Sequence, residues 1–182
     1  MSDRNEENLK LKEALKEIHT QVNTWLSFAE AKNGALIGFN IALVSFIKSF
    51  KVIGKAETLK YFIVAGYIIA TFVALFSFIP DLRKAKKLIR ELTQEEREKT
   101  NLLYYRDIKK YNASTYIIEL CKRYLNQNVE NNQIERYMLD LAEEIIQNSR
   151  ISSRKYITFL VALCIDFIMI DVLLIGIFII RI

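Results

Sequence analysis

An uncharged apolar segment from Tyr61 to Ile79, YFIVAGYIIATFVALFSFI, constrains this chain more than any other feature. A helix of that length crosses a hydrocarbon core of about 30 Å. A helix in a soluble core rarely stays apolar on every face over such a length. Pro80 and the basic run RKAKK follow it, as is typical where a helix leaves a membrane. The pattern predicts a transmembrane helix over 61–79.

A second apolar segment, Tyr156–Ile180, is long enough to span a bilayer with some tilt, but Asp166 and Asp171 interrupt it. A carboxylate inside a membrane is costly, so each should face protein, water or a partner. By helical rise, Lys48 and Asp171 reach similar depths and could pair. Two interpretations remain open: a structural pair plus one hydrogen-bonded acid, or the lining of a pore or water path.

The first candidate span has only 14 mostly apolar residues from Gly34 to Ile47, and it reaches 20 when extended to Ile53, with Lys48 and Lys51 near its end. Both lysines can extend toward the interface, and Gly54 suits the C-cap of such a helix. We predict that 34–53 and 61–79 form a tight membrane hairpin.

Polar residues mark the entry to this span, in the stretch FAEAKNGALIGFN. We expect Glu30 and Lys32 to lie among hydrated headgroups, with Asn33 at the boundary. Asn40 lies roughly 10 Å deeper along the helix, so it should face another helix.

Three spans would place the N-terminus and Asp81–Lys155 on one side of the membrane. That segment carries 16 Lys/Arg against 12 Asp/Glu, which predicts a cytoplasmic location and an inner-membrane protein. Lysines 48, 51, 55 and 60 of the hairpin oppose this orientation. The predicted organisation is an amphipathic cytoplasmic helix over 1–33, a transmembrane hairpin over 34–80, a cytoplasmic helical region over 81–155 and a transmembrane helix over 156–182.

The remaining sequence is helical in pattern, so the predicted fold class is all-α. Apolar residues recur mostly at three- and four-residue spacing near the N-terminus: Leu9, Leu11, Leu15, Ile18, Val22, Trp25 and Leu26. The second span should continue outward as a helix over 82–92. Thr93–Glu96 reads as a capping box, and 112–114 and 126–128 mark breaks. The last helical pattern runs from about residue 133 into the final span.

No motif points to catalysis, so we predict that the chain is not an enzyme. Phosphate-loop, dinucleotide and nucleophile-elbow patterns are missing from the sequence. His19 suits a charged helix surface, and Cys121 and Cys164 are too differently placed to suggest a disulfide. Without a Cys/His cluster we expect no metal site and no cofactor. The net charge of +5 is too small to indicate nucleic-acid binding.

A basic set of Arg150, Arg154 and Lys155 precedes the last span, as an interfacial anchor or a phosphate contact. The segment NLLYYRDIKKY adds aromatic stacking surfaces and Arg106. By residue type, the candidate ligand residues are Tyr104, Tyr105, Arg106, Arg150 and Arg154.

The ordered series of these segments resembles the transmembrane effectors of Pycsar antiphage systems. The similar segments are WLSFAEAKNGALIGFN (25–40), FIPDLRKAKK (78–87), NLLYYRDI (101–108) and QNSRISSRKY (147–156). The chain departs from the family pattern in having Glu30 where Asp is usual and Ala31 where Thr is common. The substitution at 31 removes a hydroxyl, while that at 30 keeps the charge.

The resemblance implies an effector that senses cyclic CMP or cyclic UMP made by a partner pyrimidine cyclase. It would then impair the inner membrane as a homo-oligomer and cause abortive infection. Two other functions remain open: a membrane scaffold that binds a protein partner, and a small oligomeric ion channel or transporter subunit that uses the intramembrane acids.

Overall fold

Three long helices organise the chain in the computed structural model, which describes residues 2–51, 53–79, 92–130 and 133–180. They are α1 (Ser2–Ser49), α2 (Lys55–Leu75) and α6 (Arg136–Ile180). All regular elements in these ranges are helical, in agreement with the predicted all-α class. The chain divides into two compact units. We call Met1–Ser27 with Asp81–Ser153 the polar unit, and Phe28–Pro80 with Arg154–Ile182 the bundle unit.

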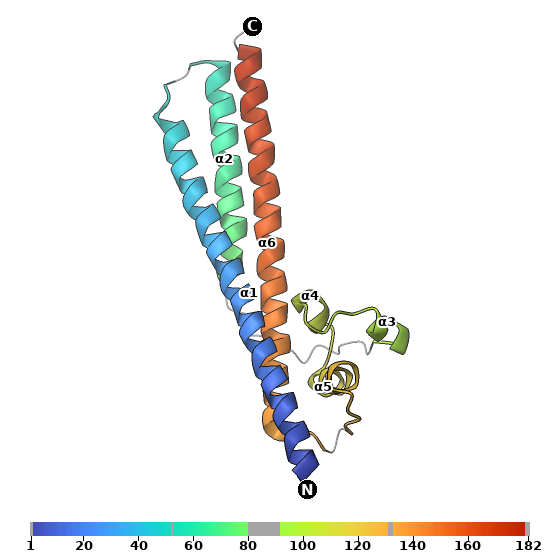
Figure 1. Cartoon of the computed structure of the whole chain (residues 1–182). Helices are drawn as coiled ribbons and strands as arrows, with labels where there is room; N and C mark the ends of the chain where they lie inside the picture. The colour runs from blue at the N-terminus through green and yellow to red at the C-terminus, as the bar shows by residue number, and fades with distance from the viewer. Residues whose placement is uncertain (1, 52, 80–91, 131–132, 181–182) are drawn as a thin grey trace. The chain divides into compact units, whose positions relative to one another are not determined.

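The polar unit packs short helices against the first part of α1 and the first part of α6 (Figure 1). The short elements are α3 (Gln94–Glu98), α4 (Tyr105–Ile108), α5 (Ala113–Leu120) and the π-helical turn η2 (Cys121–Leu125). Its core draws on the predicted stripe of α1 at Leu11, Leu15, Ile18 and Val22. Leu9, predicted in the same stripe, is instead exposed.

The predicted helix signals of this unit are confirmed by its caps. Thr93 and Glu96 form the reciprocal capping box at the start of α3. The Asn112 side chain accepts a hydrogen bond from the Thr115 amide and begins α5. Asn126 ends η2 in the left-handed conformation, with φ of 53°. The predicted helical extension over 82–92 lies almost wholly outside the described residues, as do Pro80 and the basic run after it.

The bundle unit is three helices side by side, formed by the second part of α1, by α2 with its short 3-10 extension η1 (Phe76–Phe78), and by the second part of α6 (Figure 1). Small residues allow α2 and α6 to approach closely. A Cβ atom on Gly66 would lie 2.0 Å from Sδ of Met169, and one on Gly176 would lie 2.3 Å from Leu59.

Two predictions about the first span need correction. Helix α1 ends at Ser49, so Gly54 is not its C-cap; Gly54 instead precedes α2, with φ of 70°. Among the described helices, two rather than three are long and apolar enough to cross a membrane: Ala56–Phe78 and Arg136–Gly176. The early end of α1 and its polar entry residues leave too short an apolar stretch within that helix.

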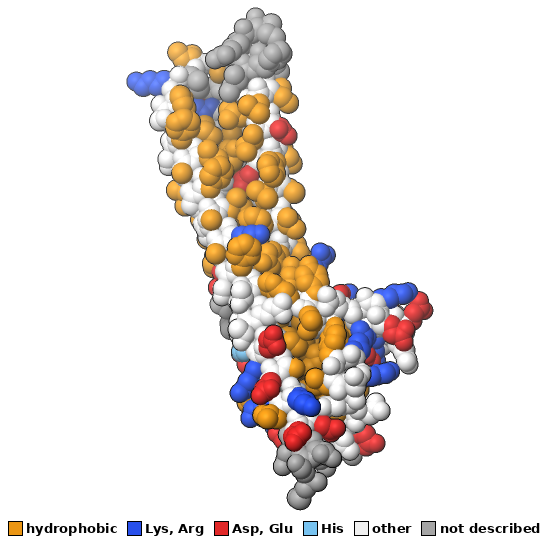
Figure 2. All heavy atoms as spheres, viewed as in Figure 1, with side chains coloured by type: hydrophobic (Ala, Val, Ile, Leu, Met, Phe, Trp, Pro, Cys, Tyr) orange, Lys and Arg blue, Asp and Glu red, His pale blue; other side chains and the backbone are white. Residues whose placement is uncertain are grey.

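The apolar side chains of the bundle unit are largely exposed, unlike those of a soluble core. Only 39% of the most apolar part of Ala56–Phe78 and 22% of that of Arg136–Gly176 is buried. Figure 2 shows hydrophobic side chains covering the visible face of this unit. Examples on the three helices are Phe39, Ile41, Phe46, Phe62, Ile69, Phe72, Leu160, Phe167 and Ile168. Such a surface is stable in lipid rather than in water.

Candidate functional sites

The entry stretch of α1 is tied to α6 by an ion pair and an amide. The Glu30 carboxylate lies 3.0 Å from the ammonium of Lys155, a residue only 5% exposed. Asn33, fully buried, donates to the carbonyls of Ala29 at 2.9 Å and Lys155 at 3.1 Å. The charge of Glu30 therefore compensates a buried ammonium, in addition to any contact with headgroups.

Lys32 is partly exposed, and its ammonium lies near three aromatic rings. Its ammonium lies 4.5 Å from the ring centre of Phe28, 5.6 Å from that of Tyr156 and 5.5 Å from that of Phe159. Three rings around one cation give a favourable cation–π environment at the boundary of apolar surface. The headgroup location expected for Lys32 stays a prediction.

A layer of three buried polar side chains crosses the interior of the bundle unit, one from each long helix. Asn40, Tyr67 and Asp166 are exposed by 0%, 1% and 2%. The Asn40 amide and the Tyr67 phenol both lie within interaction range of the Asp166 carboxyl. Among the described residues, however, neither amide atom of Asn40 nor either oxygen of Asp166 has a partner with hydrogen-bond geometry. Such an incompletely satisfied group costs about 1–3 kcal/mol.

The second intramembrane acid is not part of this layer. Asp171 and Lys48 are both exposed, and no ion pair joins them within the described part of the chain. The backbone carbonyls of Lys48 and Phe50 instead accept hydrogen bonds from the Lys60 ammonium, at 3.2 Å and 2.6 Å. Lys60 thereby caps the end of α1.

The aromatic part of the predicted ligand site is a packed cluster in the polar unit. Tyr105 is 8% exposed, and its ring centre lies 5.3 Å from that of Trp25 and 4.7 Å from that of Tyr104. Tyr104 also meets Trp25 edge-on. Arg106, the next residue of α4, is exposed. These rings are engaged with one another, so their stacking faces are already partly used.

The two arginines predicted with them have structural partners. Arg150 donates to the carbonyls of Lys109 at 3.3 Å and Tyr111 at 3.4 Å, and burial lowers its pKa. Arg154 belongs to the bundle unit, where it donates to the Ile79 carbonyl at 2.9 Å. Four of the five predicted ligand residues thus lie in the polar unit and Arg154 in the bundle unit, and their role in ligand binding stays a prediction.

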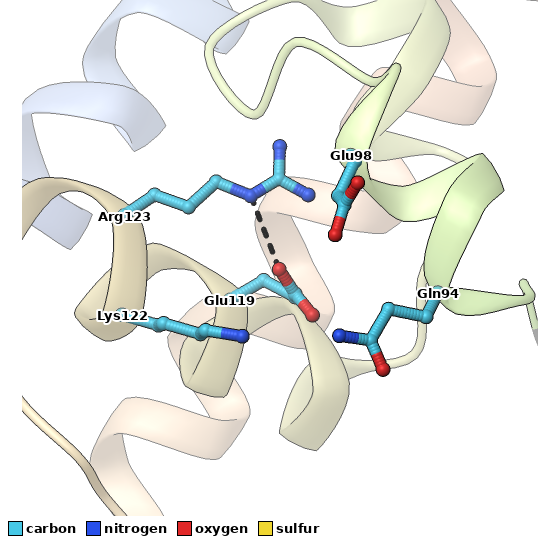
Figure 3. A pocket seen from close by; sticks show the side chains of 5 residues that line it. All are labelled: Gln94, Glu98, Glu119, Lys122 and Arg123. Atoms are coloured by element: carbon cyan, nitrogen blue, oxygen red, sulfur yellow. Dashed lines mark hydrogen bonds and ion pairs between the residues drawn. The ribbon is translucent and has the colours of Figure 1, made fainter.

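A polar pocket of about 300 Å³ opens between α3 and the end of α5 with η2 (Figure 3). Five charged or polar side chains line it: Gln94, Glu98, Glu119, Lys122 and Arg123. None of them was singled out from the sequence, because the pocket depends on α3 folding back beside η2. The π-helical turn, which periodicity does not reveal, supplies two of the five.

His19 and the cysteines show no catalytic arrangement. The His19 ring lies 3.1 Å from both the Glu144 carboxylate and the Asn23 amide, on the side of α1. Cys121 is buried and Cys164 exposed, each as a free thiol. Within the described residues, no group of three His, Cys, Asp or Glu side chains could hold a metal ion.

A family model for the Pycsar effector protein domain matches residues 14–182. The chain belongs to the Pycsar effector family. No curated protein and no solved structure matches it. Membership in this family, together with two exposed apolar helices of sufficient length, makes the chain a membrane protein of an antiphage Pycsar system. The resemblance drawn from segments 25–40, 78–87, 101–108 and 147–156 is therefore confirmed.

Proposed function

We propose that this Pycsar effector senses a cyclic pyrimidine nucleotide, cyclic CMP or cyclic UMP, and then impairs the inner membrane. A partner cyclase supplies the nucleotide, the effector acts without catalysis as a homo-oligomer, and the outcome is abortive infection. The observation that carries this proposal is the bundle unit, whose exposed apolar helices enclose the polar layer of Asn40, Tyr67 and Asp166. An acid held inside an apolar bundle is a natural element for opening a polar path.

The second part of α1 belongs to the bundle unit with the two candidate spans and also presents exposed apolar side chains. Phe39, Ile41 and Phe46 are more than half exposed there, and Leu36 and Ile47 pack inward. We propose that the polar unit, which contains the N-terminus, is cytoplasmic, because residues 81–155 carry an excess of Lys and Arg. Because Lys60 caps the carbonyl end of α1, one of the four hairpin lysines is accounted for by local structure.

The decisive experiment reconstitutes the purified full chain in dye-loaded liposomes of phosphatidylethanolamine and phosphatidylglycerol. Cyclic CMP or cyclic UMP should cause dye release, whereas cyclic AMP and cyclic GMP should not. Equal release without any nucleotide would contradict the proposal and favour a constitutive channel. No release, with or without nucleotide, would favour a scaffold instead.

A further inference from the structure

The pocket between α3 and η2 has one side chain held by a hydrogen-bond network, Arg123, and other polar side chains that make no such contacts. Arg123 forms the floor: its guanidinium lies 3.1 Å from the Glu119 carboxylate and donates to the carbonyls of Thr100, at 3.0 Å, and Arg97. It therefore binds the end of α3 to the α5–η2 segment. The positive charge of Arg123 interacts favourably with the carbonyl groups at the C-terminal end of α3. This interaction helps to hold α3 and η2 in place on either side of the pocket.

Three lining side chains remain available for a ligand. Gln94, Glu98 and Lys122 are exposed, and none has a hydrogen bond or ion pair with another described residue. In Figure 3 the Lys122 ammonium and the Gln94 amide point toward one another across the pocket, with Glu98 above them. The set supplies one cation, one anion and one neutral group that both donates and accepts.

The local backbone sets where the side chains of Lys122 and Arg123 project. Lys122 and Arg123 lie on the π-helical turn η2, which Asn126 ends with a positive φ. The turn continues α5 directly, and π turns are common at the C-terminal ends of helices. In this turn Arg123 enters the floor network while Lys122 lines the open part of the pocket.

We infer that this pocket is the cyclic-nucleotide site of the protein, with Lys122 holding the phosphate. This inference rests on the proposed function. A volume of about 300 Å³ is at the small end of ligand sites and suits a mononucleotide. The singly charged cyclic phosphate pairs with the Lys122 ammonium. The Gln94 amide can serve the edge of either pyrimidine, and Glu98 accepts from an amino or ribose hydroxyl group.

A ligand in this pocket would connect two elements of the polar unit. A ligand that contacts Gln94 and Glu98 on one side and Lys122 on the other bridges α3 and η2.

Binding to the detergent-purified full chain tests the site by titration calorimetry. The probes are cyclic CMP, cyclic UMP, cyclic AMP, cyclic GMP and inorganic phosphate. Lys122→Ala should weaken the binding of cyclic CMP and cyclic UMP by about tenfold or more, as expected for one charge-assisted contact. Glu98→Gln should change the ratio between the two pyrimidines. Lys10→Ala removes an exposed lysine of the same unit outside the pocket and should bind as the wild type does.

The outcomes separate the site from the function. If the wild type binds a cyclic pyrimidine nucleotide and both pocket variants bind equally well, the site is wrong while the proposed function stands. If the wild type binds no cyclic nucleotide, the proposed function fails. Equal weakening by Lys10→Ala, or full competition by inorganic phosphate, would reduce Lys122 to a general anion attraction and overturn nucleotide recognition here.

Discussion

The Glu30 carboxylate lies 3.0 Å from the Lys155 ammonium, and this pair joins α1 to α6 inside the bundle unit. The two partners differ in environment, since the side chain of Lys155 is 7% exposed and that of Glu30 is 47% exposed. Lys155 also lies 5.1 Å from the ring centre of Phe78. The lysine therefore depends on Glu30 and one aromatic face for compensation of its charge.

Replacing Glu30 by Gln should destabilise the bundle unit. The substitution leaves Lys155 buried without its anion, which is far more costly than losing a surface pair. Because Glu30 is half exposed and screened, we expect a loss of about 1–2 kcal/mol rather than the full buried value. Thermal unfolding of the detergent-purified protein measures the change. The reversed pair, Glu30→Lys with Lys155→Glu, should recover part of the loss, and an unchanged melting temperature for Glu30→Gln would contradict the prediction.

Helix positions in this chain were largely predictable because each carries a local signal. The capping box at Thr93, the cap at Asn112 and the uninterrupted pattern into the last span all act over a few residues. The end of α1 was not predictable in the same way. Apolar residues continue past Ser49, and periodicity alone did not show that the helix stops there.

The functional residues were harder to predict, since their partners are distant in sequence. Asn40 could be expected to face another helix from its depth, but pairing it with Asp166 requires the packing of α1 on α6. Lys48 was predicted to pair with Asp171 because the two residues reach similar depths along their helices. Depth does not show which face of each helix carries the side chain. Nothing in the sequence pattern indicated that Lys122 would line a pocket, because a π turn has no characteristic sequence period.

Cys121 should resist thiol reagents while the polar unit is folded. Burial, with a smaller effect of Glu7, raises its pKa from 9.0 to about 11. The reactive thiolate is therefore scarce at pH 8 and increases only as the pH approaches 11. In a Cys164→Ser background, maleimide labelling at pH 8 should be slow in the native protein and rapid in denaturant. Rapid native labelling would contradict the described burial.

The same shift predicts a pH dependence of stability. Above pH 9 the unfolded thiol loses its proton before the folded one, so the unfolded state binds fewer protons. Stability from this group is thus complete below pH 9 and is lost progressively toward pH 11. Unfolding of the Cys164→Ser protein between pH 8 and pH 10.5, compared with a variant that also carries Cys121→Ala, isolates this contribution.

Gly66→Ala should loosen the contact between α2 and α6. The new Cβ would lie 2.0 Å from Met169 Sδ, so the methionine must move. Overpacking of this kind costs about 1–3 kcal/mol, which offsets or exceeds the gain of about 1 kcal/mol from Gly to Ala in a helix. Gly38→Ala is the matched control, since nothing lies within 4 Å of its Cβ position. We expect the control to melt at or above the wild-type temperature and Gly66→Ala to melt below Gly38→Ala; equal melting would contradict the close approach.

Asn40→Leu and Asp166→Leu should preserve folding but abolish activity. Both replace a buried, incompletely satisfied polar group by an apolar one with the same number and branching of side-chain heavy atoms, so insertion and thermal stability should be unchanged or improved. If the polar layer opens the path through the membrane, nucleotide-dependent dye release and cell killing should fall at least tenfold in both variants. Ser45→Ala is the control on α1, because the Ser45 hydroxyl is exposed and donates only to the Ile41 carbonyl of its own helix. Wild-type release by both leucine variants would show that the layer is tolerated rather than used.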